Sequence, residues 1–307
     1  LVIAAMLCST SCSDYLDIVP EGTPSMDNAF SNRINSFKFL HTCYSYLPSW
    51  DQGGSIGFLA GDEHWLMPKG TGFIDQRISL NAWEIGRGEQ NNNDPYQNFW
   101  DGGNGGTNLW VAIRDCNIFL ENINKPLDLQ NYERTRWIAE VKFLKAYYHY
   151  YLFMLYGPIP IMDHALKMDD EMTYFPRNTF DQCVDFIVSD CQYGIDGALP
   201  MIYTNASGTV AESLYGRATK AAAYALKARV LLYAASPLFN GNADYAKFAN
   251  EDGTLLFAPK DDSKWGKAAA AAKEAIDKIE GSSYYGLYYS DEPDNGYRNY
   301  MELFLPS

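Results

Sequence analysis

Aromatic and polar side chains of one long loop could together bind a sugar. Between residues 60 and 101 the chain carries flat rings among carboxyl, amide and guanidinium groups. The residues of this kind are Asp62, Trp65, Arg77, Trp83, Asn91 and Trp100. A flat ring covers the apolar face of a sugar, and the polar groups hydrogen-bond its hydroxyls. The loop therefore predicts a ligand-binding site. The alternative is that its tryptophans only pin the loop onto the core.

The motifs that would indicate catalysis are weak. Asp62 and Glu63 could form the acid pair of a glycoside hydrolase, but the two carboxyls must face one bond from two sides, which sequence neighbours rarely do. His64 lacks a second histidine at metal-ligand spacing. The glycine-rich residues 102–106 lack the Lys-Ser/Thr of a phosphate loop, and 291–296 is only distantly similar to a calcium loop. We therefore expect no catalytic residue, no metal and no cofactor.

The first residues have the pattern of an export signal that ends at a cysteine. The apolar residues 1–7 lead into small residues that precede Cys8 and Cys12. A cysteine in this place resembles a bacterial lipobox, in which the thiol carries the lipid of an outer-membrane anchor. Cys12 fits better because Thr10 and Ser11 precede it. We expect residues 1–11 to be a lipoprotein signal remnant, the alternatives being an ordinary signal or a buried strand.

Composition bounds the class of protein. The 307 residues allow one large domain or two ordinary ones, and a hydrophobic content of 47% supports a substantial core. The net charge of −14 argues against nucleic acid as a partner. After residue 7 no apolar run approaches the length of a transmembrane helix. Four scattered cysteines lie within helical patterns and are expected to be small core residues: Cys43, Cys116, Cys183 and Cys191.

Apolar or small residues recur at alternating spacings of four and three, which is typical of one face of an α-helix. Six stretches show this pattern: 30–44, 109–123, 137–155, 180–191, 221–235 and 265–279. The third has a second apolar stripe, so it must be covered on two sides. Alternation with period two is absent. The pattern predicts an all-α fold of stacked helix pairs with long inserted loops, the longest at 48–106, and an irregular, tyrosine-rich segment at 281–307.

Several stretches together resemble the SusD/RagB family of outer-membrane nutrient-binding lipoproteins from Bacteroidetes. The chain from Cys12, Cys-Ser-Asp-Tyr-Leu-Asp-Ile, is similar to the mature start of that family. Residues 110–123 and 139–160, the latter ending in Leu-Tyr-Gly-Pro-Ile-Pro, resemble two of its core helices, and 221–238 resembles a third block. The resemblance covers nearly the whole chain in order. It implies that the sequence is truncated at both ends.

The resemblance implies a tetratricopeptide-like helical domain over residues 12–307, with its C-terminal part missing. It also implies a surface-exposed lipoprotein of the cell outer membrane, lipid-anchored through Cys12. The implied partners are an oligosaccharide or another nutrient, and a SusC-like TonB-dependent transporter that receives it. Nucleic acid is not among them.

In this family the corresponding early loop often contributes to the glycan site, so the resemblance favours Asp62, Arg77, Trp83 and Asn91 as ligand contacts. It implies capture of a ligand without chemistry. Two alternatives remain from the residues themselves: an all-α polysaccharide-degrading enzyme, and a helical-repeat adaptor that binds only protein.

Overall fold

The computed structural model describes residues 26–48, 81–166 and 175–305. The described residues form helices joined by loops, with no strand beyond two isolated bridges. The helices are α1 (Met26–Ala29), α2 (Arg33–Ser45), α4 (Asn81–Gly86), α5 (Leu109–Asn122), α6 (Asn131–Tyr156), α7 (Phe180–Asp196), α8 (Lys220–Ala235), α9 (Ser263–Glu280) and α10 (Gly296–Leu303). The all-α prediction is confirmed, and each of the six predicted stretches coincides with a helix.

Local sequence signals set the ends of these helices. The first backbone N–H groups of a helix need an outside acceptor, and five of the described α-helices receive one from a side chain. These caps are Asn32 for α2, Asn108 for α5, Thr179 for α7, Thr219 for α8 and Asn295 for α10. At the other end of α6, Gly157 adopts φ 73°, a conformation that suits glycine, and Pro158 follows.

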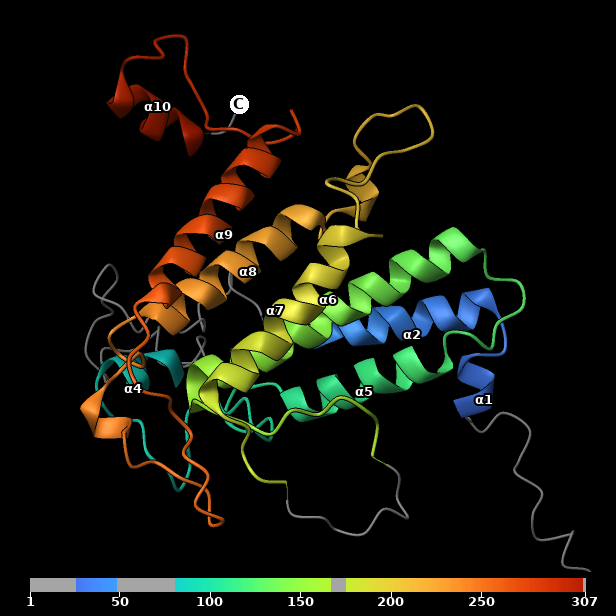
Figure 1. Ribbon diagram of the computed structural model, residues 1–307. Helices are drawn as coiled ribbons and strands as arrows, with labels where there is room; N and C mark the ends of the chain where they lie inside the picture. The colour runs from blue at the N-terminus through green and yellow to red at the C-terminus, as the bar shows by residue number, and fades with distance from the viewer. Residues whose placement is uncertain (1–25, 49–80, 167–174, 306–307) are drawn as a thin grey trace, which may run out of the picture.

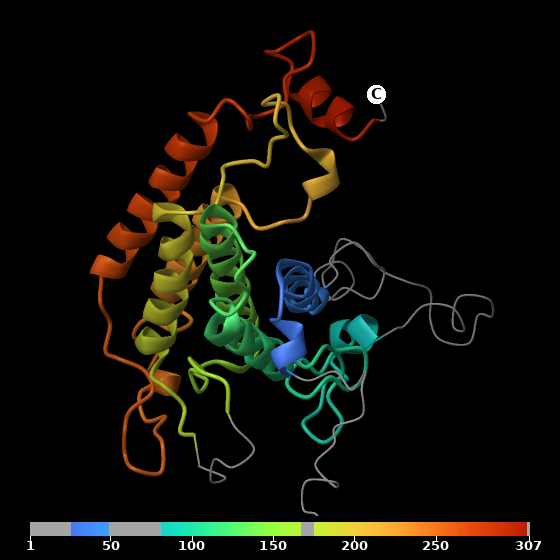
Figure 2. The same cartoon turned by 90° about the vertical axis from the view of Figure 1, so that its right-hand side faces the viewer.

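Helix α6 lies at the centre of the array. Successive helices from α5 to α9 pack against one another in chain order, and α6 also contacts α2 and α8. Figure 1 shows α6, α7, α8 and α9 side by side, and in Figure 2 helices α2 and α9 lie on opposite sides of α6. The second apolar stripe of α6 is buried at Phe143, Ala146, Tyr150 and Phe153, and the first is buried from Trp137 to Tyr151, with only Leu155 at its end exposed. The expectation that this helix is covered on two sides is confirmed.

The four cysteines that the structure describes are buried and unpaired, as expected for small core residues. They lie on α2, α5 and α7 and contribute to the central core cluster. Burial disfavours the charged thiolate and raises the pKa of the Cys183 thiol to about 11. These side chains are packing groups rather than nucleophiles.

Two expectations about the later part of the chain are wrong. On α8 and α9 the predicted apolar faces are not the buried ones: α9 buries Ala268, Ala271 and Ala275 against α8, whereas Trp265 and Ile276 are about half exposed. The segment expected to be irregular also contains α10. Its N-cap is Asn295, whose side chain accepts a hydrogen bond from the Arg298 backbone N–H. After this cap, apolar residues recur at helical spacing (Tyr297, Tyr300, Met301 and Phe304), so the sequence carries both signals of a short helix.

Candidate functional site

Only part of the predicted site falls on described residues. Cys12, Asp62, Trp65 and Arg77 lie outside them. Trp83 belongs to α4, whose backbone is described, but its side chain is outside the description. Asn91 and Trp100 are described in full. The site is therefore built from the loop that carries these two residues and from the helices that support it.

The loop before α5 is held by hydrogen bonds to both α5 and α6. Asn98 Oδ1 accepts from the backbone N–H of Trp100 (3.0 Å) and of Asp101 (3.3 Å). The Phe99 N–H donates to the hydroxyl of Tyr156 at 3.1 Å. A Cβ on Gly106 would lie 2.0 Å from the carbonyl oxygen of Asn98, so only glycine fits this turn. The backbone that presents Trp100 is thus fixed on both sides.

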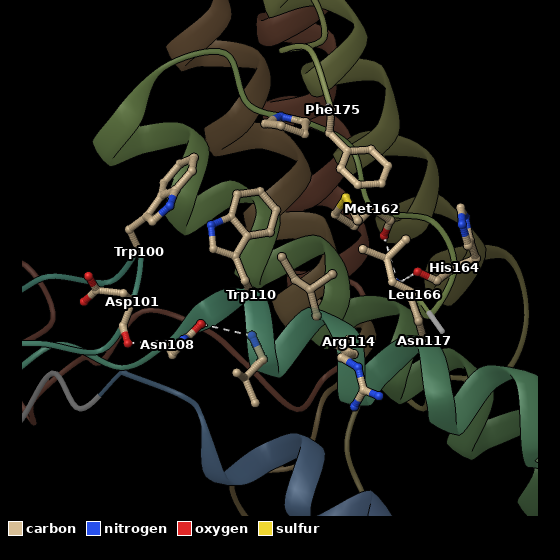
Figure 3. A pocket seen from close by; sticks show the side chains of 13 residues that line it. Trp100, Asp101, Asn108, Trp110, Arg114, Asn117, Met162, His164, Leu166 and Phe175 are labelled. Carbon is tan, nitrogen blue, oxygen red and sulfur yellow. Dashed lines mark hydrogen bonds between the residues drawn. The ribbon is translucent and has the colours of Figure 1, made fainter. Parts of the chain in front are cut away.

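Trp100 is a half-exposed aromatic platform. Its ring makes edge-on contacts with Trp110 (centroids 5.0 Å apart) and Tyr156 (5.2 Å), and 39% of Trp100 is exposed. Figure 3 shows the indole nitrogen of Trp110 on the side that faces Trp100. This nitrogen is buried and has no hydrogen-bond acceptor among the described residues. Burial raises the pKa of Tyr156, so its hydroxyl stays protonated.

A polar hollow of about 790 Å³ lies on one side of Trp100. Its lining includes Tyr156, Leu155 and a run of amide and carboxyl side chains from the loop: Asn91, Asn92, Asn93, Asp94, Asp101 and Asn104. Asn91 itself shapes the loop, since its Oδ1 accepts from the backbone N–H groups of Asn93 and Asp94. The side chains of Asn92 and Asn93 make no hydrogen bond to other described residues, so they can meet a ligand.

A second, mostly apolar hollow of about 670 Å³ lies beside Trp100 and Trp110 (Figure 3). Met162 and Phe175 contribute to its lining. Its wall is fastened by the buried Asn117, whose Nδ2 donates to the carbonyl oxygens of Met162 and His164, both at 3.0 Å. Trp100 is thus shared by a polar and an apolar surface.

Sequence reasoning placed Trp100 here but missed Trp110, Tyr156 and Asn117. A signal existed for Asn117, which interrupts the apolar pattern of the stretch 109–123. Trp110 and Tyr156 could not be assigned, because both lie in helices whose faces were read as core.

The buried imidazole of His149 supports the same wall. The backbone N–H of Met162 donates to His149 Nε2 at 3.3 Å, so Nδ1 carries the proton and donates to the carbonyl oxygen of Lys145 at 2.8 Å. Burial lowers the pKa of His149 to about 4. The ring is therefore neutral at physiological pH. Within the described part of the chain, no three metal-ligating side chains gather into a possible metal site.

Comparisons with known proteins decide the family. The family model described as SusD-like, starch-binding and associating with the outer membrane, matches residues 70–232, more than half of the chain. The solved structure named BT4246 is 30% identical with a TM-score of 0.68, and the match covers 90% of this chain and 44% of that one. The chain belongs to the SusD-like family. A SusD-like protein from Bacteroides fragilis is 25% identical, with a TM-score of 0.52, over 69% of this chain and 38% of its own.

A SusD-like protein that binds laminarin shares the fold at 17% identity and a TM-score of 0.56, over 82% of this chain and 44% of that one. This chain therefore spans less than half the length of its solved relatives. No curated protein matches it. The SusD-like family description names binding and no reaction, in agreement with the expectation that the chain is not an enzyme. None of the described helices has the length and apolar character needed to cross a bilayer.

Proposed function

We propose that this SusD-like protein captures a glycan at the Trp100 platform. The observation that carries the proposal is the arrangement around Trp100: a half-exposed ring, clamped by Trp110 and Tyr156, beside the unbonded amides of Asn92 and Asn93. An exposed flat ring suits the apolar face of a sugar, and amides can donate to and accept from its hydroxyls. The starch-binding description of the family supports this choice of ligand class.

The proposed site extends into the preceding loop. Asp62, Trp65, Arg77 and Trp83 precede Trp100 in the same part of the sequence and have the side-chain types that bind sugars. We propose that they add contacts to the same ligand. Asn91 contributes by holding the shape of the loop, because its side-chain oxygen is already engaged by two backbone N–H groups.

The family and the first residues of the chain support a proposal for the cellular role. The protein is tethered through a lipid on Cys12 to the outer membrane, faces the cell exterior and passes its ligand to a SusC-like TonB-dependent transporter. We propose that residues 1–11 belong to an export signal and that residues 12–307 belong to the SusD-like domain. Multiple acyl chains anchor a protein firmly, so Cys12→Ala should leave the membrane fraction. Retention of this variant in the membrane fraction as firmly as the native protein would contradict the anchor.

The binding test compares two tryptophans with similar exposure. Calorimetric titration with a malto-oligosaccharide and a laminari-oligosaccharide first identifies a ligand. Trp100→Ala should then weaken its binding by about ten- to one-hundred-fold, since a stacked ring contributes roughly 1–3 kcal/mol. The control is Trp265→Ala, which removes a ring of comparable exposure (46%) on α9, remote from the site in sequence.

Two outcomes would contradict the proposal. One is equal affinity in Trp100→Ala and the native protein. The other is loss of binding in Trp100→Ala only together with loss of helical content. Trp83→Ala applies the same test to the preceding loop. Release of reducing ends from the bound glycan would favour the enzyme alternative, and binding to protein alone would favour the adaptor alternative.

A further inference from the structure

The apolar hollow beside Trp100 is lined by two residues that each carry a buried polar atom without a hydrogen-bond partner. In the part of the chain that the structure describes, four buried side-chain atoms lack such a partner. Two of the four, Trp110 Nε1 and Asn117 Oδ1, are on residues that line this hollow. A buried polar atom without a partner costs free energy, so native proteins contain few of them. Their presence at one hollow indicates that a ligand completes the hydrogen bonds there.

The amide of Asn117 is held in one orientation. Its Nδ2 donates to the carbonyl oxygens of Met162 and His164, both at 3.0 Å. Turning the amide over would place its oxygen against these two acceptors, so the orientation of Oδ1 is fixed. Asn117 is only 1% exposed, and an amide oxygen can only accept. A ligand group that meets Oδ1 must therefore be a donor, such as a hydroxyl.

The unpartnered donor and acceptor lie on one face of α5. Trp110 and Asn117 are seven residues apart, which is two helical turns and about 10 Å along the axis. Ile113 lies on the same face between them, and Figure 3 shows Met162 above this stretch of α5. The indole nitrogen of Trp110 is on the side that faces Trp100. The hollow thus has a donor at its Trp100 end, apolar side chains in the middle and an acceptor at its far end.

The titratable side chains that line this hollow lie at its rim. They are Asp101, Arg114 and His164, and all three residues are exposed. His164 Nδ1 already bonds to the Asp163 carboxylate at 2.7 Å, and Figure 3 shows the guanidinium of Arg114 extending away from Met162. A charged ligand group buried beside Met162 would have no counter-charge, which is costly. The part of the ligand inside the hollow should therefore be neutral.

We infer that this hollow is a subsite for a neutral phenolic acyl group, such as a 4-hydroxycinnamoyl ester, carried by the glycan at the Trp100 platform. The ester carbonyl accepts from the indole N–H of Trp110, the flat ring packs against Met162, and the phenol hydroxyl donates to Asn117 Oδ1. The inference rests on the proposed function, because Trp100 belongs to both the polar and the apolar hollow.

A conjugated acyl group suits this hollow better than a flexible chain. The volume of about 670 Å³ is in the range of small-molecule sites, which are mostly apolar with a few placed polar groups. A rigid, flat group keeps its carbonyl and its hydroxyl at opposite ends and loses little conformational freedom on binding. Both unpartnered atoms lie just behind the wall, so a neighbouring side chain must shift on binding, as is common at binding sites.

The first test removes one group from the ligand rather than from the protein. Calorimetric titrations compare methyl 4-hydroxycinnamate with methyl cinnamate, which lacks the phenol hydroxyl. The hydroxylated ester should bind about five-fold more tightly, because its hydroxyl gives Asn117 Oδ1 a donor. Equal affinities, tighter binding of methyl cinnamate, or no binding of either ester would overturn the inference.

The second test changes the donor in the wall. Trp110→Phe keeps an aromatic ring but removes the N–H, and it should weaken the binding of methyl 4-hydroxycinnamate about five-fold. The control Trp265→Phe makes the same change on α9, outside the hollow, and should leave the affinity for this ester unchanged. Equal affinities in Trp110→Phe and the native protein would overturn the inference.

The third test fills the hollow. Met162→Trp should weaken the binding of methyl 4-hydroxycinnamate by about ten-fold or more, while the affinity for an unsubstituted oligosaccharide stays within about two-fold. Unchanged affinity for the ester, with helical circular dichroism intact, would overturn the inference. If Met162→Trp does not fold, the ester pair and Trp110→Phe decide.

A joint titration separates this inference from the glycan proposal. Methyl 4-hydroxycinnamate should keep its affinity in the presence of a saturating unsubstituted oligosaccharide, because the two ligands occupy different hollows. Competition between them would overturn the inference, since it would place the ester on the ring face of Trp100. Oligosaccharide binding without ester binding contradicts only the phenolic subsite. Ester binding without oligosaccharide binding contradicts only the glycan proposal and supports the phenolic subsite.

Discussion

Helices α6 and α9 both carry two apolar stripes, yet they have opposite surroundings. In α6 each stripe meets other helices, and Glu140, Lys145 and His149 are buried among them. In α9 one stripe packs on α8 and the other is exposed. An apolar stripe is typical of a helix face that packs against a neighbour. Whether another described helix covers that face depends on the position of the helix in the stack.

The buried polar side chains of α6 are stabilised by hydrogen-bond partners on neighbouring elements. Glu140 is fully buried, and its carboxylate accepts from Arg217 (2.6 and 2.9 Å) and from the Tyr44 hydroxyl (2.7 Å). A buried charge needs such partners because desolvation is costly. Helix α9 has no equivalent, since its charged residues remain at the surface or only partly covered.

The largest loss in the free energy of unfolding should come from truncating a buried side chain at the centre of the stack. Phe153 on the second stripe of α6 is fully buried and contacts the rings of Phe180 and Tyr233. Phe153→Ala should lower the free energy of unfolding by about 3–5 kcal/mol, since it removes apolar contacts and leaves a cavity. Urea unfolding followed by circular dichroism measures this. A loss below 1 kcal/mol would mean that α6 is not the packing centre.

Removing the partner of the buried carboxylate should cost nearly as much. Arg217→Met removes the guanidinium from Glu140 and leaves this carboxylate with tyrosine hydroxyls such as that of Tyr44. We expect a loss of about 3 kcal/mol in the free energy of unfolding. The double variant Glu140→Gln with Arg217→Met removes the uncompensated charge and should recover part of this loss. If the double variant is less stable than Arg217→Met alone, the ion pair is not the reason for the loss.

The buried His149 of α6 should make stability depend on pH. Its pKa falls from 6.5 to about 4 in the folded state, so between these values the unfolded chain binds the extra proton. The stabilisation is therefore present above pH 6.5 and is lost as the pH falls through 6.5 toward 4, by up to about 3 kcal/mol. Unfolding free energies of the native protein and His149→Gln, measured from pH 7 to 4, should converge at low pH. Parallel curves would exclude His149 as the source.

The smallest change in the free energy of unfolding should come from a substitution on the exposed stripe of α9 (Trp265, Ala269, Ala272 and Ile276). Ala272→Leu places a larger side chain in solvent and should change the unfolding free energy of the 307-residue chain by less than about 0.5 kcal/mol. The matched change Ala146→Leu on α6 should cost about 1–3 kcal/mol, because Ala146 is fully buried and its neighbours must move. Equal costs for the two substitutions would show that the α9 stripe is already packed in this chain.

The buried faces of α5, α6 and α7 were predictable from the sequence, whereas those of α8 and α9 were not. The spacing of Leu109, Ile113 and Cys116 on α5, and of Val184 and Ile187 on α7, marked the buried side correctly. These helices have neighbours on the side that their pattern indicates. On α9 the same spacing marked the exposed side, because alanine stripes on two faces satisfy the pattern equally well.

Some residues of the candidate site were predictable from the sequence and others were not. Trp100 was proposed from its type and its place in a long loop, and it lies between two hollows. Asn91 was proposed for the same reason, but its amide oxygen holds the loop backbone. Trp110 and Tyr156 reach the site from α5 and α6, about 10 and 56 positions along the chain from Trp100. Contacts across such separations follow from packing and leave no local pattern.

The sequence by itself determined the six long helices α2 and α5 to α9, because periodicity, capping residues and glycine stops are local properties of neighbouring residues. It also determined the family, through blocks that occur in order along the chain. Only the tertiary structure decided which stripe of each helix is covered, and which rings and amides meet around Trp100. Those outcomes depend on the direction in which one helix crosses the next, and that direction is set by the packing of all the helices together.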